Sequence, residues 1–254
     1  MCTALLSIEP GRPTLLVGVR DELADRPWEL PGPHWPEWPE LLGGKDLQAG
    51  GTWLAVSPRE RRAATVLNGR GQPAPAAARQ SRGALPLQAA AGKPLDRGTV
   101  ANADPFHLIT VEIDGALVQS WDGYSLTERE LGPGLYFTVN SGFSDELLPA
   151  AGPHELGRIR HFLPRFRAAS RPEPEPGLPV AAAWGEWLTL VNGDGIGSHD
   201  ERALIVERDL GGGRTFATTS VSLVALSPDW LRYDFTARPG HLDAWYPVRV
   251  SPSS

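Results

Sequence analysis

The chain has 254 residues, of which 41% are hydrophobic and 21% are charged, and its formal net charge at pH 7 is −6. This acidic balance argues against a nucleic-acid partner, which requires a basic surface. One cysteine excludes an intramolecular disulfide, and the lack of any run of about 18 apolar residues argues against a transmembrane helix.

The first fifty residues predict a β-hairpin and a long loop. Residues 2–8 and 13–20 are apolar and partly β-branched, and the Pro-Gly turn between them favours a hairpin. Residues 25–50 hold five prolines and predict a loop, which at this length is usually functional. This segment contains three tryptophans, Trp28, Trp35 and Trp38. They form either a lid over an apolar ligand or an anchor that holds the segment to the core.

The middle of the chain predicts further antiparallel strands. Residues 71–79 predict a surface loop, and a short helix is expected over 81–91. Asp114-Gly115 is a strong hairpin signal between two of the strands. The expected strands cover 50–56, 62–67, 106–113, 116–121 and 135–139.

The last third combines helices and strands. In 154–168, apolar residues recur at helical spacing with arginines on the other face, and Pro164 is expected to kink or end this helix. An acidic, proline-rich linker follows at 171–179. The remaining expected elements are a short helix at 180–190 and strands at 202–208, 214–225 and 230–236. The whole predicts one α+β domain over residues 1–254.

Cys2 follows the initiator methionine, and methionine aminopeptidases remove Met1 when the next side chain is small. A freed Cys2 would carry a thiol and an α-amine, whose ordinary pKa values are near ~8.5 and ~8. The amine can then act as the base for the thiol, as in N-terminal nucleophile catalysis. The alternative is a small cysteine that packs like alanine.

The expected hairpin places charged side chains beside Cys2. An antiparallel pair brings the start of one strand next to the end of its partner, which here carries Arg20 and Asp21. A guanidinium lowers the pKa of a neighbouring thiol, and the Asp21 carboxylate could accept a hydrogen bond from the α-amine. The alternative is a surface ion pair of little energetic consequence.

Three more polar residues are candidates for the same site. Asn140 closes a strand and either donates its amide to an oxyanion or makes only local turn hydrogen bonds. Asn68, before Gly69, is a turn residue with a chance of lining the site. Arg82 either reaches an acidic ligand group or is solvated. Together with Trp28, Asn68 and Arg82 are candidates for substrate binding, and no cysteine–histidine cluster predicts a metal site.

Several short segments occur in a characteristic order over the first ninety residues. They are Met1-Cys2, Val19-Arg20-Asp21-Glu22, Leu42–Leu47 with Gly50–Leu54, Leu67–Arg70 and Ser81-Arg82-Gly83. In this order they resemble the NRDE family, which includes transport and Golgi organisation protein 2 and is named for an Asn-Arg-Asp-Glu motif. The resemblance continues more loosely through Asn140-Ser141.

The sequence departs from that family pattern in two places. Val19 stands where the family has asparagine, and a Thr-Arg-Ser-Ser-like family segment appears here only as Ser198–Arg202. These departures remove side chains that the family signature contains. The loss of the motif asparagine at position 19 therefore favours a non-catalytic carrier, or a chemistry that differs from that of the family.

The NRDE family is in turn similar to the N-terminal-nucleophile hydrolases, above all the choloylglycine hydrolase and penicillin V acylase group. Those enzymes also begin Met-Cys-Thr and place an arginine and an aspartate at the end of the second strand. The resemblance implies an αββα sandwich, with two stacked antiparallel sheets between helical layers. It also implies an amidase-type site in which Cys2 attacks a carbonyl.

Three functions stay open on the sequence. The first is a cofactor-free amidohydrolase that uses Cys2 on a small linear amide or acylated amine. The second is a non-catalytic carrier of haem or lipid, in which Cys2 and His34 offer ligands to haem iron. The third is an interaction module. Because Glu9 and Arg12 end the first apolar run, no secretory signal is expected, which indicates a cytoplasmic protein of undetermined oligomeric state.

Overall fold

The N-terminal hairpin lies at the centre of the larger of two main sheets. In the computed structural model, which describes residues 2–144 and 151–250, β1 (Thr3–Ile8) pairs antiparallel with β2 (Thr14–Leu23), with Thr3 opposite Val19. The other edge of β1 pairs with β10 (Gly134–Val139), and β2 pairs with β13 (Thr215–Leu226). The hairpin expected from the sequence is confirmed.

The remaining strands complete this sheet and build the second one. The eight-stranded sheet runs in the order β11 (Gly142–Phe143), β10, β1, β2, β13, β14 (Leu231–Thr236) and β15 (Tyr246–Pro247), with β12 (Glu207–Asp209) paired to β13. The five-stranded sheet runs in the order β5 (Leu54–Ser57), β6 (Arg62–Asn68), β7 (Phe106–Val111), β8 (Ala116–Trp121) and β9 (Leu126–Leu131). β3 (Trp28–Gly32) and β4 (Gly43–Asp46) form a separate hairpin.

Three hydrophobic layers hold these elements together. Leu6 and Leu16 from the larger sheet meet Leu54 and Ile109 from the smaller one, so the two sheets stack face to face. Because side chains alternate along a strand, the other faces of both sheets are free to bury helices. Both faces of β2 are buried, which explains its nearly continuous apolar sequence.

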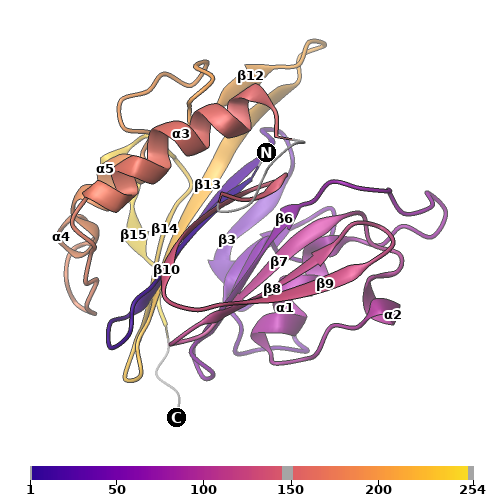
Figure 1. The fold of residues 1–254 in the computed structure, drawn as a ribbon, viewed down its shortest axis with the longest axis horizontal. Coiled ribbons are helices and arrows are strands. Elements are labelled where there is room, and N and C mark those ends of the chain that lie inside the picture. The colour runs from indigo at the N-terminus through magenta and orange to yellow at the C-terminus, as the bar shows by residue number, and fades with distance from the viewer. Residues whose placement is uncertain (1, 145–150, 251–254) are drawn as a thin grey trace.

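Helices cover the two outer faces (Figure 1). On the larger sheet lie α3 (Pro153–Ala168), α4 (Val180–Trp184) and α5 (Glu186–Val191). The smaller sheet packs against α1 (Leu85–Ala90), which follows η1 (Arg82–Ala84), and against Val100 of α2 (Arg97–Val100). η2 (Leu242–Ala244) lies between β14 and β15 in the chain. The α+β sandwich of stacked antiparallel sheets is thus confirmed, with a thinner helical layer on the smaller sheet.

Two predicted elements end elsewhere than expected. Residues 200–205 do not form the strand predicted over 202–208, because Asp200 accepts hydrogen bonds from the backbone and guanidinium of Arg202 and closes a turn. Only β12 remains of that strand. The helix predicted at 154–168 is present, but Pro164 does not end it, since Leu163 and Phe166 on either side are buried against the sheet.

Two further expectations need correction. The helix predicted over 180–190 is divided into α4 and α5 at Gly185, whose φ of +49° is unfavourable for other residues. Residues 25–50, expected to be a loop, contain the β3–β4 hairpin. Trp35 in this segment is 5% exposed and donates to the Gly50 carbonyl over 2.8 Å, so it anchors the segment to the core.

The proline-rich segment 171–179 is held against the larger sheet. Arg171 donates to the Ser7 hydroxyl over 2.9 Å, and Arg232 donates to the Glu175 carbonyl over 2.6 Å. Arg12, in the β1–β2 turn, pairs with Glu173 at 2.6 Å. These contacts connect the segment to the hairpin turn and to β14.

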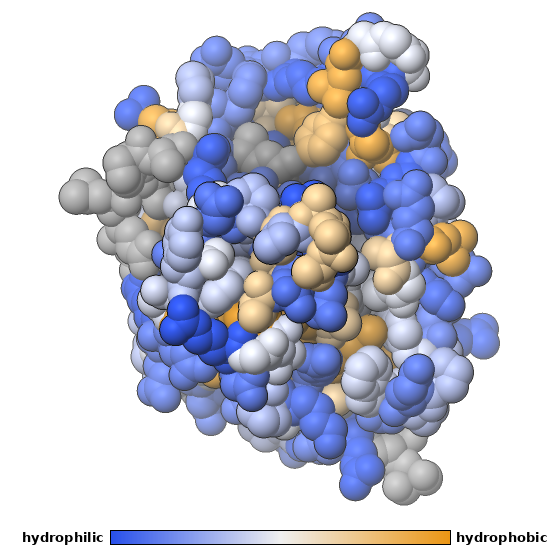
Figure 2. Space-filling view, turned by 90° about the vertical axis from the view of Figure 1, so that its right-hand side faces the viewer, coloured by the Kyte–Doolittle hydropathy of each residue, from blue (hydrophilic) through white to orange (hydrophobic). Residues whose placement is uncertain are grey.

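The face of the molecule opposite α3–α5 is mostly hydrophilic. In Figure 2 hydrophobic side chains on this face occur in small separate groups. Within the described residues, no helix has the length and apolar character needed to cross a bilayer.

Candidate active site

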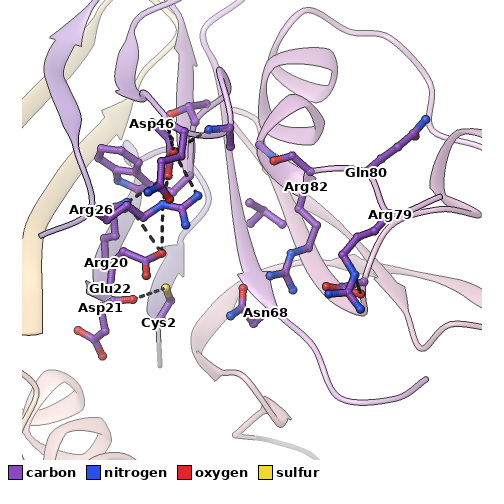
Figure 3. A pocket seen from close by; sticks show the side chains of 18 residues that line it. Cys2, Arg20, Asp21, Glu22, Arg26, Asp46, Asn68, Arg79, Gln80 and Arg82 are labelled. Atoms are coloured by element: carbon purple, nitrogen blue, oxygen red, sulfur yellow. Dashed lines mark hydrogen bonds and ion pairs between the residues drawn. The ribbon is translucent and has the colours of Figure 1, made fainter. Parts of the chain in front are cut away.

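A cavity of about 410 Å³ opens where the N-terminal strands meet the end of the smaller sheet (Figure 3). One wall comes from the start of β1, the end of β2 and β4, and the other from the end of β6 and the segment before α1. Its polar lining includes Cys2, Arg20, Glu22, Arg26, Asp46, Asn68, Arg79, Arg82 and Asp104. Four residues expected at one site, Cys2, Arg20, Asn68 and Arg82, therefore share one cavity.

Cys2 lies directly before β1 and is half-buried. Its Sγ lies 3.8 Å from the backbone oxygen of Asp21, and its backbone nitrogen donates to Oδ1 of Asn140 over 3.2 Å. Burial raises the pKa of the Cys2 thiol, while the Arg20 guanidinium acts to lower it. The thiol thus needs a base to form a thiolate near neutral pH. The expected removal of Met1 concerns a residue outside the described part of the chain.

Arg20 projects from β2 into the cavity and is 4% exposed. Its Nη2 lies 3.3 Å from Asp46 Oδ2 and 4.0 Å from Glu22 Oε2. Its guanidinium stacks on Trp53, with 4.4 Å from the guanidinium carbon to the ring centroid. These contacts hold a buried positive charge on the same wall as Cys2, as the hairpin geometry predicts.

Asp21 faces the other way because neighbouring side chains on a strand alternate. Its carboxylate lies on the helix side of the sheet, 3.2 Å from Nη1 of Arg158 in α3, and accepts from the Thr218 hydroxyl over 2.6 Å. Arg158 also donates to the Thr3 hydroxyl over 2.6 Å and to the Ala203 carbonyl over 2.9 Å. The expected contact of Asp21 with the nucleophile therefore involves its backbone carbonyl, whereas its carboxylate anchors the strand to α3.

Arg158 is a residue that the sequence interpretation missed. The helical pattern placed the α3 arginines on the face opposite the apolar residues, yet Arg158 is 1% exposed. It lies on the buried side because Asp21, distant in sequence, supplies a charge partner there. Helical periodicity alone contains no signal for such a long-range pair.

Asn140 and Trp28 lie outside the cavity lining. Asn140 follows β10 and holds the nitrogen of Cys2 through its side-chain oxygen, which places it at the nucleophile but in a positioning contact. Trp28 begins β3 and packs edge-on against Trp53, with 5.6 Å between ring centroids, and against Phe235. Trp53, and none of the tryptophans of segment 25–50, contributes an aromatic surface to the cavity.

Arg26 and Asp46 were also not expected at the site. Arg26 Nε lies 2.6 Å from Asp46 Oδ2, and Asp46 also accepts from the backbone nitrogens of Gln48 and Ala49. Although partial burial acts to raise it, the bonds from Arg26 and Ala49 hold the pKa of Asp46 below its usual range. This carboxylate therefore keeps its negative charge and fixes both arginines.

Two glycines set the wall opposite Cys2. A Cβ on Gly51 would lie 2.2 Å from the carbonyl carbon of Gly83, so only glycine allows this approach. Next to this contact, the Thr52 nitrogen donates a 2.8 Å hydrogen bond to the Gly83 carbonyl. It fixes the backbone beside Arg82 at the cavity rim.

The potential ligands of the cavity, as far as the structure describes them, are not grouped as a metal or haem site. Among the described residues, no group of three or more histidine, cysteine, aspartate or glutamate side chains has the arrangement of a metal site. His34, the expected second haem ligand, is not part of the cavity lining and instead contacts the Leu30 carbonyl and Glu29. A pair of iron ligands from Cys2 and His34 therefore does not fit this arrangement.

A comparison with known protein families gives one match that covers this part of the chain. A family model described as Transport and Golgi organisation 2 matches residues 1–161. That range contains every residue that lines the cavity, as well as Asn140 and Arg158. No curated protein matches the chain.

Proposed function

Since the chain belongs to the Transport and Golgi organisation 2 family, we propose that its cavity is the active site of an amidohydrolase with Cys2 as nucleophile. The observation that carries this proposal is the position of Cys2. Its thiol faces a cavity beside the buried Arg20, and its nitrogen is held by Asn140. The substrate would be a small linear amide or acylated amine.

The first step requires a free Cys2 amine, which removal of Met1 would provide. The neutral amine takes the proton of its own thiol, because the two ordinary pKa values lie within about one unit of each other. Asn140 Oδ1 accepts from this nitrogen and orients its lone pair toward the sulfur. Arg20 then stabilises the thiolate electrostatically.

The thiolate next attacks the carbonyl carbon of the substrate and forms a C–S bond. The carbonyl oxygen becomes an oxyanion, for which Asn68 offers an amide donor from the opposite cavity wall (Figure 3). One such donor contributes roughly 2.7–4 kcal/mol in a working site. Collapse of this intermediate breaks the C–N bond, and the protonated α-amine gives its proton to the leaving amine.

Water completes the reaction. The α-amine, now neutral again, takes a proton from a water molecule that attacks the thioester carbonyl. The C–S bond breaks, the carboxylic acid leaves, and the proton returns to the thiolate. One amide and one water thus give one acid and one amine without any redox step or metal.

A non-catalytic carrier is the competing function. The same cavity would then bind a small molecule and release it unchanged. Haem is a poor fit because, among the described residues, no histidine lines the cavity with Cys2. Lipid is also disfavoured by four arginines in the lining, unless the lipid carries an anionic group.

Turnover by Cys2 variants separates the two functions. We expect the wild-type protein to hydrolyse at least one member of a panel of N-acyl anilides that vary in acyl length and include carboxylate-bearing members such as succinanilic acid, measured by aniline release. Cys2→Ala and Cys2→Ser should lose this activity at least ~1000-fold while keeping the wild-type thermal unfolding midpoint. A panel member cleaved equally well by wild type and folded Cys2→Ala would show that Cys2 is not the nucleophile.

A further inference from the structure

The charges that line the cavity do not balance. Among the described residues, the cavity lining contains four arginines and three carboxylates that face it, namely Arg20, Arg26, Arg79 and Arg82 with Glu22, Asp46 and Asp104. The fourth carboxylate, that of Asp21, pairs with Arg158 on the far side of the sheet. One positive charge is therefore left over.

The ion pairs identify which arginine carries it. Arg20 and Arg26 share Asp46 and Glu22, and Arg79 lies 3.1 Å from Asp104. Arg82 forms no ion pair with any carboxylate of the described chain. Within the same described residues its only hydrogen bond runs from Nη1 to the Pro105 carbonyl over 2.8 Å, so Nε and Nη2 stay available.

Arg82 is also partly removed from water. Burial lowers the pKa of its guanidinium, and the nearby Asp104 carboxylate, which is bound to Arg79, offsets the loss of hydration only in part. Charged groups in such positions are normally paired, because a buried charge without a partner loses its hydration and gains no ion pair to compensate for it. The backbone beside it is fixed by the contact between Gly51 and Gly83 and by the bond from Gly83 N to Ser81 Oγ.

We propose that Arg82 binds the carboxylate of the substrate, so that the proposed hydrolase acts on amides that bear a carboxylate a few bonds from the scissile carbonyl. The inference depends on the proposed function in one respect only, namely that the bound molecule contains an amide that Cys2 cleaves. A guanidinium recognises a carboxylate through two parallel N–H···O bonds, and Arg82 has two N–H groups free for them.

The position of Arg82 sets the orientation of the ligand. Figure 3 shows its side chain reaching into the space between the two walls, on the side opposite Cys2 and next to Asn68. A bound carboxylate would point its attached chain across the cavity toward the sulfur. The volume of about 410 Å³ suits a small molecule of this kind.

Binding to the Cys2→Ala protein tests this inference separately from turnover. The carboxylate can lie on the amine side of the amide, as in N-acetyl-β-alanine, or on the acyl side, as in succinamate. Each acid is titrated calorimetrically beside its methyl ester, which removes the charge and adds only one methyl group. We expect at least one acid to bind ~10-fold or more tightly than its ester, and the acid that does so identifies the side.

Variants of Arg82 then assign the preference. In the Cys2→Ala background, Arg82→Gln should abolish it and Arg82→Lys should retain part of it, since lysine keeps the charge but lacks the planar pair of donors. Arg97→Gln is the matched control, because exposed Arg97 also donates to one backbone carbonyl but lies outside the cavity. Its acid preference should equal that of Cys2→Ala alone.

Two outcomes would overturn the inference: esters that bind as tightly as their acids, or an unchanged acid preference in folded Arg82→Gln. If Arg82→Gln does not fold, Arg82→Lys decides, and an unchanged preference there contradicts the assignment. Failure of the proposed function looks different. Acids would then bind through Arg82 while the wild-type protein hydrolyses none of the amides.

Discussion

At the scale of single residues, the site depends on which face of β2 each side chain occupies. Arg20 and Glu22 face the cavity, while Asp21 faces α3 and meets Arg158. The sequence correctly predicted that the end of β2, which carries Arg20 and Asp21, lies beside Cys2. It could not say that the Asp21 carboxylate has a buried partner, because that partner comes from a helix more than 130 residues away.

The buried pair of Asp21 and Arg158 should be essential for stability. Arg158→Met removes one charge and leaves the other buried, so we expect a loss of about 3–5 kcal/mol in the free energy of unfolding, measured in urea. The double variant Asp21→Leu with Arg158→Met should recover part of that loss, since both charges are gone. A wild-type free energy of unfolding in Arg158→Met would refute a structural role for this pair.

Asp46 should make stability depend on pH. Its pKa is lowered in the folded protein, so its contribution is present above its unfolded pKa of about 4 and is lost as pH falls through the folded value. Asp46→Asn should therefore reduce stability at pH 7 and flatten the acid limb of a plot of urea midpoint against pH. The exposed Asp25→Asn is the control. Parallel acid limbs for wild type and Asp46→Asn would contradict this origin of the pH dependence.

At the scale of elements, local patterns identified most strands but failed where distant contacts decide. The strands β1, β2, β7, β8 and β10 have apolar runs and turn signals, and all lie where expected. β9 was not expected, because its sequence is largely charged and it is an edge strand. Pro164 was expected to kink or end α3, yet the helix continues past it to Ala168, with Leu163 and Phe166 buried on either side.

The break between α4 and α5 depends on the backbone of Gly185. Its φ is +49° and no atom lies within 4 Å of a Cβ built there, so a larger residue would suffer only backbone strain. We expect Gly185→Ala to lower the free energy of unfolding by about 1–2 kcal/mol. Gly197→Ala, at an equally open position without positive φ, should change it much less. Equal effects of the two substitutions would show that backbone conformation at Gly185 is not strained.

At the scale of the whole molecule, the family match and the fold have different boundaries. The match ends at residue 161, within α3, whereas the larger sheet needs β13 and β14 from the last third of the chain. β13 pairs with β2 along nearly its full length, from Phe216 opposite Leu23 to Leu226 opposite Thr14. The sequence could place these strands, but not their insertion beside the N-terminal hairpin, because pairing order leaves no local pattern.

We therefore expect the full chain to unfold as one unit. A protein truncated after residue 161 would expose the edge of β2 and the apolar face that α5 covers. It should lack a cooperative thermal transition by circular dichroism, whereas the full chain should show one. A truncated protein with a sharp transition would instead establish an independent N-terminal domain.

The central claim is that the Cys2 sulfur, next to its own free α-amine, is the nucleophile. Intact-mass spectrometry of protein quenched during turnover tests it most directly. We predict a mass lower than the full sequence by one methionine residue, plus a fraction increased by one acyl group that maps to Cys2. A turnover-competent protein that retains Met1, or an acyl group on another residue, would contradict the account.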